Sequence, residues 1–221
     1  MMRYLCFLLL AVLCAGRDLA GEADHGRRVV DIYVLRAGEQ LQSPHVVTYR
    51  VAEWEQMRGR WILPDVGYYD TGYGKDQIWF TGAGGDVLHS RHVDWQQELY
   101  FSQEAGPASA NKRSLWVWPV LDVRFRPRLT GQFVPYPTIP LDLAQRSSFD
   151  VDRAKVEWAA SSHWQAGVGY AGGLCGSRTW QNHPFLTVTR TTRVGKVEAW
   201  LEQISGGAEV QLRYLLVRDE R

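Results

Sequence analysis

The sequence predicts an all-β fold, a single antiparallel up-and-down β-barrel of about 12 strands, and three observations lead to this prediction. Apolar and polar residues alternate in segment after segment, and a period of two places them on opposite faces of a strand. Turn-like clusters such as Asp70-Thr71-Gly72 and Ser205-Gly206-Gly207 separate the segments. Helical periodicity is almost absent, and no linker divides the chain of 221 residues. We therefore expect one barrel domain over residues 17–221.

Twelve segments have the strand pattern, and residues that favour turns or loops bound each of them. In chain order they are Val29–Arg36, His45–Trp54, Arg60–Tyr69, Gln77–Gly84, His92–Ser102, Leu115–Arg126, Leu129–Tyr136, Val151–Ala160, Trp164–Ala171, Phe185–Thr192, Lys196–Ile204 and Glu209–Val217. Ten strands is the alternative, if Val29–Arg36 or Leu129–Tyr136 lies outside the wall. The longer connections are Glu104–Arg113, Pro135–Phe149 and Gly172–His183. Long loops at one end and tight turns at the other are typical of such a barrel.

The segment RSLWVWPVLDVRFRPRL, residues 113–129, has two clearly different faces. Alternate residues from Leu115 to Phe125 are all apolar, whereas the opposite face ends in Arg124, Arg126 and Arg128. The same separation recurs over residues 152–160 and 209–216, where charged or amide side chains alternate with apolar ones. Each of these segments is therefore expected to be a strand with one polar and one apolar face.

Residues 1–16 have the layout of a secretory signal peptide. The positive charge of Arg3 precedes the apolar run Tyr4–Leu13, and Cys14-Ala15-Gly16 offers small residues at the cleavage point. This run is too short to span a bilayer, and no later segment reaches about 18 uninterrupted apolar residues. We therefore expect an exported protein without a transmembrane helix in its mature part.

The alternation alone fits two architectures. In a soluble β-barrel the apolar face lines the core, whereas in a membrane barrel the apolar face meets lipid and the charged face lines the lumen. Strand length favours the membrane barrel, because the segment 115–126 is longer than the roughly five or six residues usual in globular proteins. A soluble periplasmic β-barrel that binds an apolar ligand is the alternative. Pro119 fits a closed barrel least well, because proline removes a ladder donor and a barrel has no edge strand.

Three stretches carry a resemblance to a known family: LWVWPVLDVRFRP, DRAKVEWAASSHWQAGVGYAGG and KVEAWLEQISGGAEVQLRYLLV. On these stretches the chain resembles the small outer-membrane β-barrel, porin-like proteins of Gram-negative bacteria. The resemblance implies a location in the cell outer membrane, with outer-membrane lipid and the barrel-assembly machinery as partners. Such proteins usually end on an aromatic residue, whereas this chain offers Tyr214 in the last strand and then the segment Val217–Arg221.

Charged residues of the polar faces are the candidate lumen lining. They are Arg124, Arg126, Arg128, Arg153, Lys155, Glu157, Glu98, Asp122 and Arg213. The arginines could form a ladder that favours anionic solutes, or they could form interior ion pairs with carboxylates such as Asp94, Glu198 and Glu202. The near balance of the two signs favours the ion pairs. We therefore expect either a small-solute channel or a plugged structural barrel with a charged lumen.

A barrel lipid hydrolase is a further hypothesis, but the residue pairs that would support it are incomplete. Ser161 and His163 would share a face but lie in a predicted turn without a third partner, and His89 and Ser90 would point to opposite faces. The sequence has no metal-ligand spacing, phosphate loop or dinucleotide fingerprint, so we expect no enzyme, no metal and no cofactor. A formal net charge of +1 gives no support to nucleic-acid binding.

Overall fold

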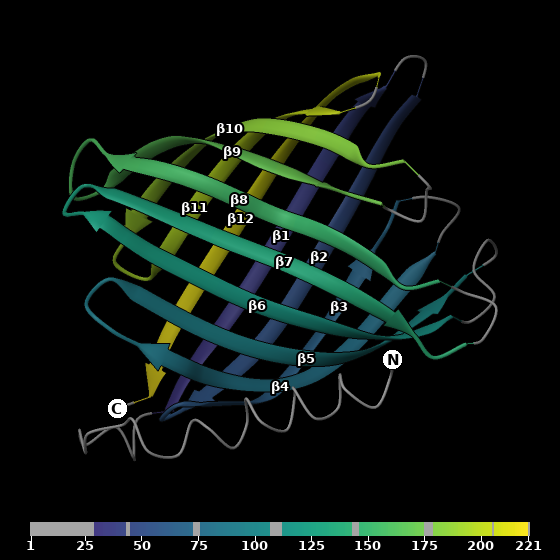
Figure 1. The fold of residues 1–221 in the computed structure, drawn as a ribbon, viewed down its shortest axis with the longest axis horizontal. Coiled ribbons are helices and arrows are strands. Elements are labelled where there is room, and N and C mark those ends of the chain that lie inside the picture. Colours follow the sequence, from purple (N-terminus) through teal and green to yellow (C-terminus); the bar gives the residue numbers. More distant parts are fainter. Residues whose placement is uncertain are drawn as a thin grey trace.

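Over the residues that the structure describes, the chain forms a closed barrel of twelve antiparallel strands (Figure 1). The computed structural model describes residues 29–42, 45–72, 76–106, 112–142, 146–174, 179–204 and 206–220. The strands are β1 (Val29–Gln42), β2 (His45–Arg58), β3 (Trp61–Asp70), β4 (Gln77–His89), β5 (Val93–Ala105), β6 (Arg113–Arg126), β7 (Leu129–Pro140), β8 (Ser148–Ala159), β9 (Trp164–Gly173), β10 (Gln181–Thr192), β11 (Gly195–Ile204) and β12 (Gly207–Glu220). Each strand pairs with its neighbours in sequence, and β1 pairs with β12 to close the ring. The expected signal peptide, residues 1–16, lies outside the described residues.

The predicted number of strands is confirmed, and the segments 29–36 and 129–136 both lie in the wall, within β1 and β7. Several of the predicted strands are shorter than the observed ones. β7 runs to Pro140, into the segment predicted as a loop, because its residues continue to pair with β8. β12 runs to Glu220, into the predicted tail, because it continues to pair with β1.

The two ends of the barrel differ in their connections. At one end, on the left in Figure 1, the strands are joined by turns at residues 59–60, 90–92, 127–128, 160–163 and 193–194. The longer connections, at residues 71–76, 106–112, 141–147 and 174–180, all join strands at the other end. This separation of tight turns from longer loops is the one expected for an up-and-down barrel.

Burial along the strands is inverted relative to a soluble barrel. Val168 and Leu186 are 61% and 59% exposed, whereas the inward carboxylates of Glu98 and Glu198 belong to residues only 4% and 5% exposed. Lys155, in β8, is 9% exposed. The alternative of a soluble barrel around an apolar ligand is therefore wrong, because the interior is charged and the outer surface is apolar. No helix among the described residues is long and apolar enough to cross a membrane.

Pro119 lies where the ladder between β6 and β7 opens. β6 pairs with β7 on both sides of this proline, but residues 117–120 have no partner in β7. The register on either side places Pro135 opposite Pro119, so two N–H donors are missing at the same point. The rings of Trp118 and Tyr136 cross this opening with their centroids 5.0 Å apart. The barrel thus accommodates the proline by opening one ladder locally, and no edge strand is needed.

Glycines of the inner face make room for large rings from the neighbouring strand. Gly169 of β9 pairs with Phe185 of β10, and a Cβ atom at Gly169 would lie 2.2 Å from the Phe185 ring. Phe185 in turn stacks on Trp200 of β11, with centroids 4.5 Å apart and planes at 7°. Both rings are buried, so neither can move aside to admit a methyl group.

We expect Gly169→Ala to lower the free energy of unfolding by about 1–3 kcal/mol, because the added methyl group overpacks the Phe185–Trp200 stack. Urea-induced unfolding of the detergent-folded chain, followed by tryptophan fluorescence, measures the change. Ala166→Val is the matched control, because Ala166 lies in the same strand but is exposed. Equal stability of Gly169→Ala and the native chain would contradict the packing described here.

Candidate functional site

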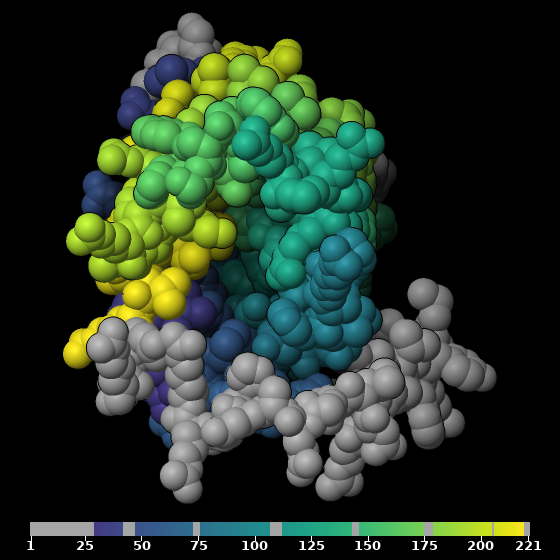
Figure 2. All heavy atoms as spheres, turned by 90° about the vertical axis from the view of Figure 1, so that its left-hand side faces the viewer, coloured from purple at the N-terminus to yellow at the C-terminus, as the bar shows by residue number. Residues whose placement is uncertain are grey.

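The interior of the barrel holds a cavity of about 1020 Å³. Side chains from every strand contribute to its lining. The lining reaches Arg124 and Lys196 near the turns and Glu104 and Arg146 near the longer loops, so the cavity extends along the whole barrel. Figure 2 looks onto the end with the turns and shows a hollow between the strands on either side. The geometry makes this cavity the candidate site.

The charges that line the cavity are unequal in number. Among the described residues of the lining, twelve are Asp or Glu and eight are Arg or Lys. The acidic group comprises Glu53, Glu55, Asp94, Glu98, Glu104, Asp122, Asp150, Asp152, Glu157, Glu198, Glu202 and Glu209. The basic group comprises Arg36, Lys112, Arg124, Arg146, Arg153, Lys155, Lys196 and Arg213. Carboxylates therefore outnumber basic groups among the described residues of the lining.

An ion pair crosses the lumen. Arg36 of β1 donates a hydrogen bond of 2.8 Å from Nη1 to Oδ1 of Asp152 in β8. These strands are five places apart in the ring of twelve, so they lie on nearly opposite walls. The Arg36 Nε–H also donates to Gln211 Oε1 of β12 at 2.7 Å. The contact therefore ties the two walls together and narrows the cavity at this level.

A second group of ion pairs lies on β8, β11 and β12. The Lys155 ammonium contacts the carboxylates of Glu198 and of Glu157, the latter at 3.0 Å. Arg213 Nη1 lies 3.7 Å from the second oxygen of Glu198. The Thr189 hydroxyl donates to Glu157 Oε1 at 2.8 Å. Such buried charges are tolerated because each one has an opposite charge or a hydrogen-bond partner.

Most of the charged residues proposed from the sequence line the cavity. They are Arg124, Arg153, Lys155, Glu157, Glu98, Asp122 and Arg213. Arg126 and Arg128 do not: both are exposed at the turn between β6 and β7. The expected ladder of three arginines is therefore reduced to Arg124, because the strand ends at Arg126 and Pro127 begins the turn. Arg124 itself contacts the carboxylate of Asp94.

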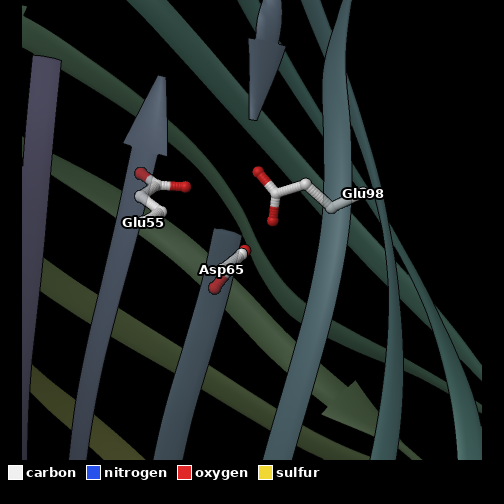
Figure 3. Close-up of side chains that lie close together, drawn as sticks. All are labelled: Glu55, Asp65 and Glu98. Carbon is white, nitrogen blue, oxygen red and sulfur yellow. The ribbon is translucent and has the colours of Figure 1, made fainter. Parts of the chain in front are cut away.

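Two of the three members of an acidic group on β2, β3 and β5 are missing from the residues proposed from the sequence. Glu55, Asp65 and Glu98 converge on one another, and Figure 3 shows their carboxylates turned toward a common point. Only Glu98 had been expected in the lumen. Glu53 and Glu55 share one face of a strand in the run Ala52-Glu53-Trp54-Glu55, and this alternation was the available signal. The position of Asp65 depends on irregularities of strand pairing that break the alternation, and the adjacent Pro64 was the available signal for them.

Among the described residues, the contacts of the serines and histidines considered for hydrolysis do not join a serine, a histidine and a carboxylate in one chain of hydrogen bonds. Ser161 Oγ accepts hydrogen bonds from the backbone N–H groups of His163 and Trp164, both at 3.2 Å. The side-chain contact of His163 is instead with the adjacent Ser162, at 2.9 Å, in an exposed turn. His89 lies 2.7 Å from Asp94, whereas Ser90 Oγ donates to the backbone carbonyl of Val93. These serines and histidines therefore form hydrogen bonds within turns, apart from the contact between His89 and Asp94.

At the end with the longer loops, Asp142 is held beside the start of β6. The backbone N–H of Arg113 donates to Asp142 Oδ2 at 2.8 Å, and the guanidinium donates to Oδ1 at 2.9 Å. The hydrogen bond from the Arg113 backbone and that from its side chain lower the pKa of the Asp142 carboxyl. This contact fastens the loop after β7 to the neighbouring strand.

No protein-family model matches the sequence, and no curated protein matches it. Solved structures do match the fold. The KdgM porin superposes with a TM-score of 0.58 at 8% sequence identity, covering 83% of this chain and 98% of that chain. The KdgM porin in complex with disordered oligogalacturonate gives a TM-score of 0.59 at 7% identity, covering 85% of this chain and 99% of that chain.

An outer membrane channel from Pseudomonas putida F1 is similar to a comparable degree. Its TM-score is 0.55 at 9% identity, covering 90% of this chain and 100% of that chain. At such low identities the similarity concerns the path of the backbone and not the residues that line the lumen. The chain has the fold of porin-like outer-membrane β-barrels.

Proposed function

We propose that this protein is an outer-membrane channel for small polar solutes, and that it favours cations and neutral solutes over anions. One observation carries the proposal: a charged cavity extends along the inside of a closed barrel whose outer surface is apolar. The fold shared with porins and an outer membrane channel supports it. The acidic excess in the lining supports the preference for cations.

Placement in a membrane follows from the outer surface. Large apolar side chains are exposed on strand after strand, including Leu99 and Phe101 of β5, Leu201 of β11 and Leu212 of β12. Lipid is the solvent in which such a surface is stable, and the paired backbone of a closed barrel is suited to it. Outer-membrane lipid and the barrel-assembly machinery are accordingly the partners that we propose.

A plugged barrel is the second candidate, and the contact between Arg36 and Asp152 favours it. This ion pair bridges opposite walls of the barrel, and it reduces the width of the lumen at that point along the axis. The cavity nevertheless has lining residues on both sides of this bridge, from Arg124 near the turns to Arg146 near the longer loops. We therefore favour a narrow channel, for which the bridge is the constriction.

Removing the bridge tests whether it limits flow. In planar bilayers the double variant Arg36→Ser, Asp152→Ser is expected to raise single-channel conductance about twofold, because the long Arg36 side chain and the ion pair are both removed from the constriction. Arg113→Ser is the control, since Arg113 is exposed at the mouth and contacts Asp142. If neither the native chain nor the double variant conducts, the plugged barrel replaces the channel as the best interpretation.

Selectivity is tested by neutralising two charges of opposite sign on the same face of β6. Asp122→Asn is expected to lower the cation-to-anion permeability ratio, and Arg124→Gln is expected to raise it, because each change removes one lumen charge. Reversal potentials in a salt gradient measure both ratios. Asp122 accepts a hydrogen bond of 2.9 Å from Gln132, and an asparagine oxygen can accept the same bond. Shifts in the same direction for both variants would contradict an electrostatic origin of the selectivity.

A further inference from the structure

The carboxylates of Glu55, Asp65 and Glu98 form a compact group inside the barrel. One oxygen from each lies within 4.8 Å of the others, and the three residues are 8%, 0% and 4% exposed. They come from β2, β3 and β5, and Figure 3 shows them converging from three separate strands. Three like charges so close together are unfavourable in a buried place unless a positive charge or protons compensate them.

Arg213 and Arg153 act on Glu55 and Glu98 only from a distance, without a close ion pair. Among the ion pairs of the described residues, none involves Glu55, Asp65 or Glu98. Both oxygens of Asp65 are buried and form no hydrogen bond of good geometry in the part of the chain that the structure describes, although Tyr100 and Glu53 lie beside them. A fully buried carboxylate beside two further carboxylates requires either a positively charged ligand or protonation.

The hydrogen bonds of Glu98 leave its carboxylate able to bind a further ligand. Gln96 donates to one of its oxygens and the Tyr100 hydroxyl donates to the other. The Tyr100 hydroxyl also lies 3.1 Å from Glu53 Oε1, so a fourth carboxylate is held beside the group. A carboxylate oxygen has two lone pairs, and each oxygen of Glu98 therefore keeps one for a further ligand. The donors fix the orientation of Glu98 without neutralising it.

The wall is shaped to let these carboxylates converge. β4 lies between β3 and β5, and its Gly82 is paired with Asp65 while its Gly84 is paired with Glu98. A Cβ atom at Gly84 would lie 2.5 Å from Cγ of Glu98, so a side chain there would displace the carboxylate. The pairing of β3 is also irregular on both sides, between Glu55 and Met57 of β2 and between Ile62 and Asp65 of β3 itself. Such bulges re-aim side chains, and here they turn Asp65 inward.

We propose that Glu55, Asp65 and Glu98 bind a divalent cation of the hard, oxygen-ligated class, with Ca²⁺ as its representative. Ca²⁺ takes carboxylate oxygens at about 2.3–2.6 Å, so ligand atoms within 4.8 Å of one another can share one ion. Water from the lumen completes the coordination, because the residues at hand supply fewer oxygens than the six to eight that Ca²⁺ takes. The inference goes beyond the channel proposal and does not depend on solute passage.

Calorimetric titration of the detergent-folded chain with CaCl₂, after removal of metal with EDTA, tests the proposal. We expect the native chain to bind one ion. Asp65→Asn and Glu55→Gln each remove a ligand charge and are expected to weaken binding by at least about tenfold. Glu209→Gln is the matched control: Glu209 is a buried lumen carboxylate that accepts from Tyr49 at 2.5 Å and Gln40 at 2.7 Å, outside the group. It is expected to bind like the native chain.

Thermal unfolding with and without CaCl₂ provides a second readout, since a ligand of the folded state raises the unfolding temperature. The increase should be present in the native chain and in Glu209→Gln, and absent in Asp65→Asn. If Asp65→Asn does not fold, Glu55→Gln alone decides. The proposal is overturned if the native chain binds no Ca²⁺, in which case the carboxylates share protons, or if all three variants bind equally well. A chain that binds Ca²⁺ but conducts no ions would refute the channel and leave this site standing.

Discussion

The ladder between β1 and β12 is the interaction on which the rest of the structure depends. It runs along the whole of both strands, from Val29 opposite Glu220 to Gln42 opposite Gly207. Lipid offers no hydrogen-bond partner, so an open sheet would leave two rows of backbone N–H and C=O groups unpaired. Once the ring closes, successive side chains of each strand point alternately into the barrel and out toward lipid. The inverted burial of charged and apolar residues follows directly from that closure.

Closure also forces the inward charges to compensate one another over short distances. Arg36 reaches Asp152 on a far strand, and Lys155 lies between two glutamates, because these groups have few other partners. The ion pairs formed by the basic side chains of β1, β8 and β12 leave Glu55, Asp65 and Glu98 without an ion pair among the described residues. The same pairing that narrows the lumen therefore leaves it acidic along one part of the wall.

The sequence was sufficient to predict the strands and their two faces, because both depend on local alternation. It was not sufficient for contacts across the ring: Arg36 and Asp152 are 116 positions apart, and their meeting depends on the shape of the closed barrel. Strict alternation also misplaces Asp65, since it groups this residue with Trp61 and Leu63, which are 56% and 60% exposed. The bulge between Ile62 and Asp65 reverses the face of the strand, and Pro64 within it was the available local signal.

The ion pairs and the acidic group differ in how their buried charges are compensated. In the ion pairs a side chain of opposite charge does so, whereas in the acidic group we propose a bound cation. If β4 had larger residues in place of its glycines, their side chains would keep the carboxylates of β3 and β5 apart. Here β4 has Gly82 and Gly84 between them, and β3 has an irregular pairing on each side, although both features weaken a sheet. These features are accounted for if convergence of the carboxylates is itself required. An ion held there would neutralise part of the acidic wall, so the net charge that a passing solute meets would depend on whether the site is occupied.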